Sequence, residues 1–209
     1  MTLSVFLAGE GRTELGGWFD AAPYRAEPPA RGVLQALLAH ACTARWEVRD
    51  ASPWKDVPLY ASGDHASPEE RRALRHILLA RERGCQVVVF ARDTDRDRDR
   101  QQQLERAIEQ APAKVPECPH VVGAPAVPNI EAWVLALQGV RGTEAMRAGA
   151  QARLVAAITK ITKGAPGYVE AMVSAVDASE GFAKVPDDAE GLLRWRDRAL
   201  KLPVADTAS

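Results

Sequence analysis

Two short, continuous apolar runs stand out in the first half of the chain. Residues 3–8 read LSVFLA and end at Gly9, and residues 86–91 read QVVVFA. Runs of this length, rich in β-branched and aromatic residues, are typical of strands buried on both faces of a parallel sheet. Residues 46–48 and 120–122 are weaker candidates of the same kind. The pattern therefore predicts a small sheet whose two strongest strands are buried.

Helical spacing of apolar residues separates these candidate strands. It is present in residues 33–41 and 100–110, and a further helix is expected from Ser67, a capping residue followed by a proline and two acids. The alternation over residues 1–140 predicts an α/β fold, a parallel sheet flanked by helices. Residues 141–209 show no strand pattern, and we expect them to form a helical C-terminal region packed on the sheet domain.

Composition narrows the class of protein. A chain of 209 residues can bury roughly 70% of its unfolded surface, so it needs no disulfide or metal to fold. The 27 basic and 28 acidic residues nearly cancel, which argues against a polycation that coats nucleic acid nonspecifically. Three cysteines without a CxxC pair exclude a disulfide scaffold or zinc ribbon and favour the cytoplasm. No apolar run approaches the length of a membrane span, so no membrane contact is predicted.

Three acidic clusters follow strands or open helices. Glu10 and Glu14 come after the first strand, Asp93 and Asp95 after the strand at residues 86–91, and Glu131 at the start of a helix. Parallel strands carry their following loops to one edge of the sheet, so we expect Glu10, Asp93, Asp95 and Glu131 to converge. In an extended strand end, Asp93 and Asp95 would face the same point. Carboxylates gathered without His or Cys favour Mg²⁺ or Mn²⁺.

Each cluster alone also has a structural interpretation, as helix-start acids or a solvated turn. Other motifs fit less well. A dinucleotide-binding turn lacks its third glycine, which is Glu14 here, and the Lys-Ser/Thr of a Walker A loop is absent. An EF-hand loop would need a glycine at Arg98 and a glutamate at Leu104. No Gly-x-Ser-x-Gly elbow supports a serine hydrolase.

Three segments together resemble the Toprim domain, the metal-binding fold of topoisomerases, primases and several nucleases. They are GEGRTE at residues 9–14, DTD at residues 93–95 and PNIEAW at residues 128–133. The sequences of these motifs resemble those of small Toprim proteins related to the overcoming-lysogenization-defect nucleases. Such proteins are typically encoded in bacterial defence loci beside an ATPase. The resemblance covers about residues 3–138. It implies phosphodiester chemistry with Mg²⁺ or Mn²⁺ and a possible ATPase partner.

Carried over residue by residue, the resemblance implies that Glu10 is a metal ligand or general base and that Glu14 serves a second metal. Asp93 and Asp95 would be the main metal ligands, and together with Glu10 they would form the catalytic set. Glu131 would be the acid of the last motif. The downstream lysine of larger relatives has three candidates, Lys160, Lys163 and Lys184.

A substrate phosphate also needs positive charge near these acids. Arg12, Arg92 and Arg96 are the local arginines expected to bind nucleic acid, DNA or RNA. Two functions stay open: a metal-dependent nuclease, the effector of a bacterial antiviral defence system, and a noncatalytic Toprim-like subunit that binds an ATPase.

Overall fold

The computed structural model describes residues 2–59, 66–146 and 149–203. It confirms an α/β fold built on a four-stranded parallel sheet flanked by helices, which is consistent with a Toprim-like fold. Parts of both predicted regions lie outside the described residues: 1 and 60–65 of the first, and 147–148 and 204–209 of the second. Among the described helices, none has both the length and the apolar character needed to cross a membrane.

The sheet has the strand order β2-β1-β3-β4, with every neighbouring pair parallel. Its strands are β1 (Leu3–Gly9), β2 (Trp46–Pro53), β3 (Val87–Asp93) and β4 (His120–Ala126). From β1 the chain moves outward to β2, whereas from β3 it moves outward to β4 on the opposite side. The space between the carboxyl ends of β1 and β3 is therefore the topological switch point, where α/β sheets bind their ligands.

The two central strands match their predicted positions closely, because both are continuous apolar runs buried on both faces. The two edge strands are longer than predicted. β2 is only half-buried, and β4 contains Gly123 and Pro125, residues that normally interrupt strands. An edge position explains the proline, because a residue without an N–H can be tolerated where one side of the strand has no partner.

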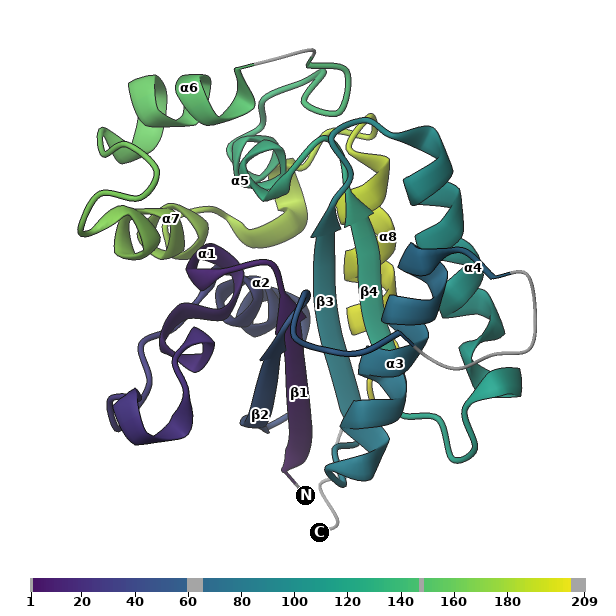
Figure 1. The fold of residues 1–209 in the computed structure, drawn as a ribbon. Helices are drawn as coiled ribbons and strands as arrows, with labels where there is room; N and C mark the ends of the chain where they lie inside the picture. Colours follow the sequence, from purple (N-terminus) through teal and green to yellow (C-terminus); the bar gives the residue numbers. More distant parts are fainter. Residues whose placement is uncertain (1, 60–65, 147–148, 204–209) are drawn as a thin grey trace, which may run out of the picture.

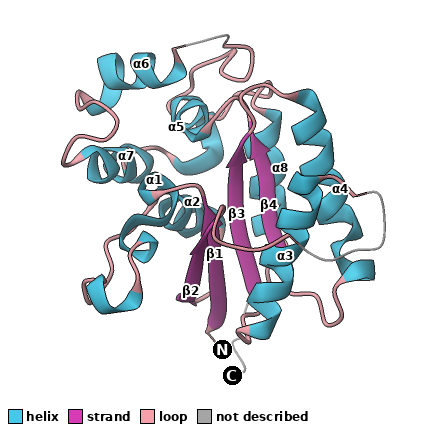
Figure 2. Ribbon diagram, viewed as in Figure 1, coloured by secondary structure: helices cyan, strands magenta, loops and turns pink. Residues whose placement is uncertain are grey.

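Eight α-helices surround the sheet in the described residues (Figures 1 and 2). They are α1 (Arg12–Leu15), α2 (Val33–Ala41), α3 (Pro68–Glu82), α4 (Arg98–Lys114), α5 (Ile130–Leu137), α6 (Ala150–Leu154), α7 (Tyr168–Asp177) and α8 (Glu190–Ala199). Short 3₁₀ turns cover Gly16–Phe19, Ala22–Tyr24 and Gly181–Lys184, and a π turn covers Val155–Thr159. Helices α3 and α4 cover one face of the sheet, α2 and α8 cover the other, and α5, α6 and α7 lie beyond the carboxyl ends of the strands.

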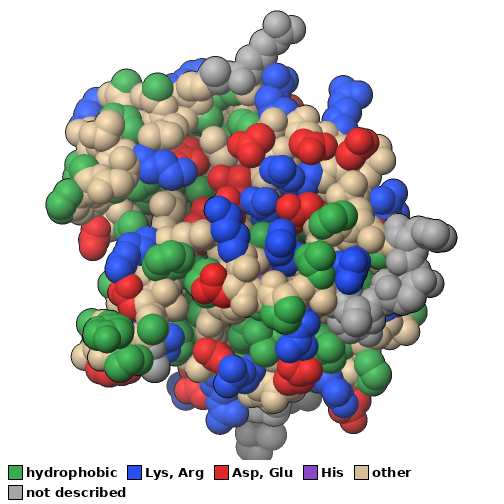
Figure 3. All heavy atoms as spheres, viewed as in Figure 1, with side chains coloured by type: hydrophobic (Ala, Val, Ile, Leu, Met, Phe, Trp, Pro, Cys, Tyr) green, Lys and Arg blue, Asp and Glu red, His purple; other side chains and the backbone are tan. Residues whose placement is uncertain are grey.

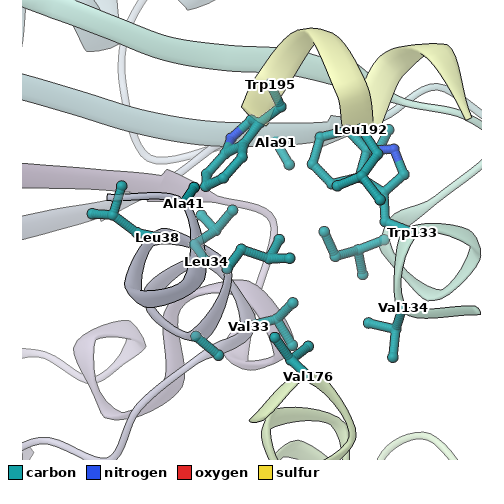
Figure 4. Close-up of a cluster of buried hydrophobic side chains, with 14 of the residues drawn as sticks. Val33, Leu34, Leu38, Ala41, Ala91, Trp133, Val134, Val176, Leu192 and Trp195 are labelled. Carbon is teal, nitrogen blue, oxygen red and sulfur yellow. The ribbon is translucent and has the colours of Figure 1, made fainter. Parts of the chain in front are cut away.

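One apolar core joins the C-terminal helices to the sheet (Figure 4). Leu34 and Leu38 of α2 pack with Trp133 of α5 and with Trp195 of α8, all of them fully buried. The Trp195 indole N–H also donates to the carbonyl oxygen of Phe90 in β3 over 3.2 Å. Helix α8 thus takes part in the same core as the central strands, and α5 is held firmly where the strands end.

Candidate active site

The first acidic pair follows β1 directly. Glu10 comes after Gly9, the last residue of the strand, and Glu14 is the third residue of α1. A Cβ at Gly9 would lie 2.6 Å from the Cβ of Glu14, so only a glycine lets α1 turn back over the strand end this closely. The Glu14 side chain is buried, and its Oε2 accepts a hydrogen bond from the N–H of Gly11 over 2.9 Å. The turn therefore buries Glu14 against the end of β1.

Asp93, the last residue of β3, connects three elements. Its N–H donates to Oε1 of Glu10 over 3.1 Å, and its Oδ1 accepts from the N–H of Ile130 over 2.9 Å. Ile130 is the first residue of α5, whose N-terminal end favours a nearby negative charge. The backbone thus holds Asp93 between the ends of β1 and α5.

Glu131 is the second residue of α5 and has no exposed surface. Its Oε1 accepts hydrogen bonds from Nζ of Lys163 over 2.7 Å and from the hydroxyl of Tyr168 over 3.2 Å. Its Oε2 is buried without a hydrogen-bond partner in the structure, an uncommon and costly state for a carboxylate oxygen. Both partners belong to the C-terminal helical region, which therefore reaches the acidic end of the sheet.

A pocket of about 370 Å³ opens where these residues meet. Its wall combines three acids with a lysine and a tyrosine: Glu10, Glu14, Asp93, Lys163 and Tyr168, together with residues 11–13, 164, 165 and 169. The pocket lies at the switch point between β1 and β3, and acidic and basic side chains gather on this face of the molecule (Figure 3). Of the predicted acids, Glu10, Glu14 and Asp93 line the pocket, and Glu131 lies behind Lys163 and Tyr168.

Two acids of the pocket, Asp93 and Glu14, have raised pKa values. Burial, followed by the charges of Glu14, Glu10 and Glu131, raises the pKa of Asp93 to about 8. Burial is also the main cause that raises the pKa of Glu14 to about 7, with Glu10 adding to it. Each carboxylate therefore resists ionisation near neutral pH unless positive charge enters the pocket.

Of the three candidate lysines, Lys163 is the one at the pocket. Burial alone would lower its pKa, but the hydrogen bond and charge of Glu131 outweigh this and raise the pKa overall. Lys163 therefore stays an ammonium ion. Lys184 instead pairs with Glu180 on an exposed surface, and Lys160 donates to the carbonyl of Ala156 within its own turn.

The three predicted arginines have different surroundings. Arg92 forms an ion pair with Glu10 and is largely buried beside the pocket. Arg12 is a pocket-wall residue, and its exposed guanidinium binds Asp20. Arg96 instead lines a separate hollow between the start of α4 and residues 144–145, and it donates to the carbonyl of Ala145.

Asp95 does not face the pocket, in contrast to the expectation from the Asp-x-Asp spacing. Its side chain is 78% exposed and lies 3.3 Å from Nη1 of Arg100. The chain is no longer extended after Asp93, because Asp95 has φ 49° and Arg96 has φ 67°. The alternation of a strand therefore does not apply, and the two aspartates point to different surroundings.

The fit to a divalent cation is partial. Oxygen donors without His or Cys suit Mg²⁺ or Mn²⁺. Burial first, and neighbouring carboxylates second, raise the pKa values of Glu14 and Asp93, and a bound cation would favour their charged forms. Within the described residues, however, no group of three or more His, Cys, Asp or Glu side chains is arranged to hold a metal ion. Magnesium often binds through one or two carboxylates, completed by water and substrate phosphate. Glu14 and Asp93 fit a site of that kind.

Sequence reasoning missed Tyr168, Glu69 and Trp54. Glu69 is in the first turn of α3, where an acid is explained by the helix dipole alone. It instead binds Arg92 and the Trp54 indole N–H, so it belongs to the surroundings of the pocket. No local pattern connects these residues with β3.

Comparisons with models of protein families, with curated proteins and with solved structures find no match.

Proposed function

We propose that this protein is a divalent-metal-dependent phosphodiesterase that cleaves nucleic acid through a Toprim-like site. One observation carries the proposal: the buried carboxylate of Glu14 and the partly buried carboxylate of Asp93, both with raised pKa values, share a pocket with Lys163 at the switch point of a parallel sheet. Perturbed acids in a cleft are typical of functional sites. The acids would favour a bound cation, and an ammonium ion beside them would favour a phosphate.

Each residue of the pocket would have its own role in such a reaction. A bound Mg²⁺ or Mn²⁺ would polarise the scissile phosphate and lower the pKa of bound water. Asp93 and Glu14 would hold the ion, and Glu10 would present one oxygen to it, as a further ligand or as the acceptor of the proton of the attacking water. Glu131 would keep the Lys163 ammonium ion directed at the pocket, where it can bind a phosphate oxygen.

Cleavage of labelled single- and double-stranded DNA and RNA, with Mg²⁺ or Mn²⁺, tests this proposal. Asp93→Asn keeps the acceptor for the Ile130 N–H but removes the charge, and we expect it to abolish cleavage. Asp95→Asn is the matched control, because the same change is made two residues away on an exposed side chain. Equal loss in the two variants, with both folded, would contradict the assignment of the pocket.

We further propose that the protein works in the cytoplasm as the effector of a bacterial antiviral defence system with an ATPase partner. The resemblance of the three acidic motifs to small Toprim proteins of defence loci supports the partner. The three cysteines, all free thiols, are compatible with a reducing compartment. Co-purification with the product of an adjacent ATPase gene tests this part separately.

The second candidate is a noncatalytic Toprim-like subunit that binds an ATPase. It is favoured by the pairing of Glu10 with Arg92 and of Glu131 with Lys163, which lets basic side chains of the chain itself balance the acids. This candidate predicts no cleavage with either metal and equal ATPase binding by the wild type and Asp93→Asn.

A further inference from the structure

Arg92 binds two acidic side chains at once: Glu10, which lines the pocket, and Glu69, which lies outside it. Its Nη1 pairs with Oε1 of Glu10, while its Nη2 and Nε bind the two carboxylate oxygens of Glu69 over 3.0 and 3.4 Å. A planar guanidinium with five N–H donors can hold both acids at once. The Arg92 side chain is only 13% exposed, so water competes weakly for these contacts.

Glu69 is itself held in place from the other side. The Trp54 indole N–H donates to its Oε2 over 3.1 Å, and the Trp54 ring is buried with the Arg92 guanidinium 5.8 Å from its centroid. Burial alone would raise the pKa of Glu69, but the hydrogen bond and charge of Arg92 outweigh this and lower it. Glu69 therefore remains a carboxylate and keeps its hold on Arg92.

This arrangement limits how Arg92 can bind Glu10. Because Glu69 occupies Nη2 and Nε, the guanidinium offers Glu10 Nη1 alone. The N–H of Asp93 binds the same oxygen of Glu10, Oε1. Both contacts thus fall on one oxygen of the carboxylate, and Oε2 is the oxygen that Glu10 can present to the pocket that it lines.

We propose that Glu69 is a positioning residue of the pocket: it holds Arg92 in a one-sided contact that leaves one oxygen of Glu10 available to a divalent cation. This inference rests on the proposed metal-dependent function. Without the Glu69 charge, the Arg92 guanidinium forms a bidentate ion pair with both carboxylate oxygens of Glu10 and neutralises the Glu10 charge. Trp54 supports Glu69 through a single N–H.

The direct test is the affinity of the full-length protein for Mn²⁺ alone, measured by electron paramagnetic resonance of the free ion. Glu69→Gln is expected to weaken Mn²⁺ binding about tenfold, the usual loss when a residue supporting a ligand is removed. The matched control is Glu82→Gln, on the same helix, whose half-exposed carboxylate pairs with Arg75. It is expected to bind Mn²⁺ as the wild type does.

The double variant Glu69→Gln/Arg92→Met separates positioning from general damage. If the loss arises because Arg92 closes over Glu10, removing Arg92 restores Mn²⁺ affinity to at least the wild-type value. A structural role of Glu69 would instead make the double variant bind more weakly than either single one. Trp54→Phe, which removes the indole N–H while keeping a smaller aromatic ring, should weaken binding in the same direction but less, and it provides a second test if Glu69→Gln does not fold.

Asp93→Asn distinguishes this inference from the proposed function. Wild-type affinity in Glu69→Gln, with binding lost in Asp93→Asn, would overturn the positioning role of Glu69 and leave the metal site intact. Unchanged Mn²⁺ binding in Asp93→Asn would overturn the metal site and, with it, the positioning role.

Discussion

Lys163 donates a hydrogen bond through Nζ to Oε1 of Glu131 over 2.7 Å, although 32 residues separate them in the sequence. The contact joins the segment before α7 to the start of α5, and Tyr168 binds the same oxygen. It brings the only lysine of the pocket wall, within the described residues, beside acids that burial would otherwise leave unbalanced.

Lys163→Met should therefore destabilise the protein. It removes the ammonium ion from a fully buried carboxylate whose second oxygen already has no hydrogen-bond partner in the structure. A loss of roughly 1–3 kcal/mol in the free energy of unfolding is expected, measured by urea denaturation. Adding Glu131→Gln should recover part of it, because a neutral amide tolerates the missing cation better than a carboxylate does.

The control for this pair is Lys184→Met. Lys184 and its partner Glu180 are both more than half exposed, and ion pairs of that kind contribute at most about 1 kcal/mol. A loss as large as that of Lys163→Met would show that lysine removal at the surface alone accounts for the effect.

The stability of the metal-free protein should fall between about pH 4 and pH 8 through the two pocket acids. Their pKa values are raised in the folded protein, to about 7 for Glu14 and about 8 for Asp93, above those of the unfolded chain. In this window the unfolded chain has lost the protons that the folded protein still binds, so rising pH favours unfolding. Each group contributes at most about 1.4 kcal/mol per pH unit.

Urea denaturation in chelator across this pH range tests the prediction. Asp93→Asn should reduce the slope, because it removes one of the two titrating groups. Asp95→Asn, with its exposed side chain, should leave the slope unchanged. A wild type and an Asp93→Asn variant with parallel pH profiles would contradict the raised pKa of Asp93.

Saturating Mg²⁺ or Mn²⁺ should raise the melting temperature of the wild type. At 100 times the dissociation constant, a ligand of the folded state contributes about 2.7 kcal/mol, or roughly 5–10 °C in a protein of this size. Asp93→Asn should melt no lower than the wild type in chelator, since it removes a repelling charge, yet gain little from either metal. Asp95→Asn should keep the full gain. Identical changes in melting temperature with metal in the wild type and Asp93→Asn would contradict a metal site at Asp93.

The parts of this site that depend on strand ends could be predicted from the sequence. Residues 3–8 and 86–91 are buried strands, and Ala8 pairs with Phe90, so the residues that follow them, Glu10 and Asp93, come close together. Asp95 could not be predicted from the same rule, because the left-handed turn after Asp93 ends the alternation of the strand.

Residues that join the site through long-range contacts also could not be predicted from the sequence. Nothing in the local sequence distinguishes Lys163 from Lys160, since both lie in the same short stretch between α6 and α7. The packing of α7 against α1 and α5 decides which lysine reaches Glu131. Glu69 likewise matches an ordinary helix-start acid, and only the position of α3 beside β3 gives it Arg92 as a partner.

A separate acid sensitivity should come from His76, which does not line the pocket. His76 lies in α3, is fully buried and stacks on the Trp54 ring with 4.7 Å between centroids. Burial, the largest cause, lowers its pKa to about 3. The folded protein therefore keeps His76 neutral, whereas the unfolded chain binds a proton once the pH falls below about 6.5. Stability from this group is fully present above pH 6.5 and is lost as the pH falls from there toward 3.

His76→Phe keeps an aromatic ring on Trp54 and removes the titrating group. Relative to the wild type, it should gain stability steadily as the pH falls from 6.5 to 4, by up to about 1.4 kcal/mol per pH unit, in urea denaturation. The comparison between the two proteins cancels Glu14 and Asp93, whose contributions change in the opposite direction over this range. His120→Gln is the control, because the His120 side chain is exposed at the start of β4. If the difference between wild type and His76→Phe does not change with pH, His76 is not held neutral by burial.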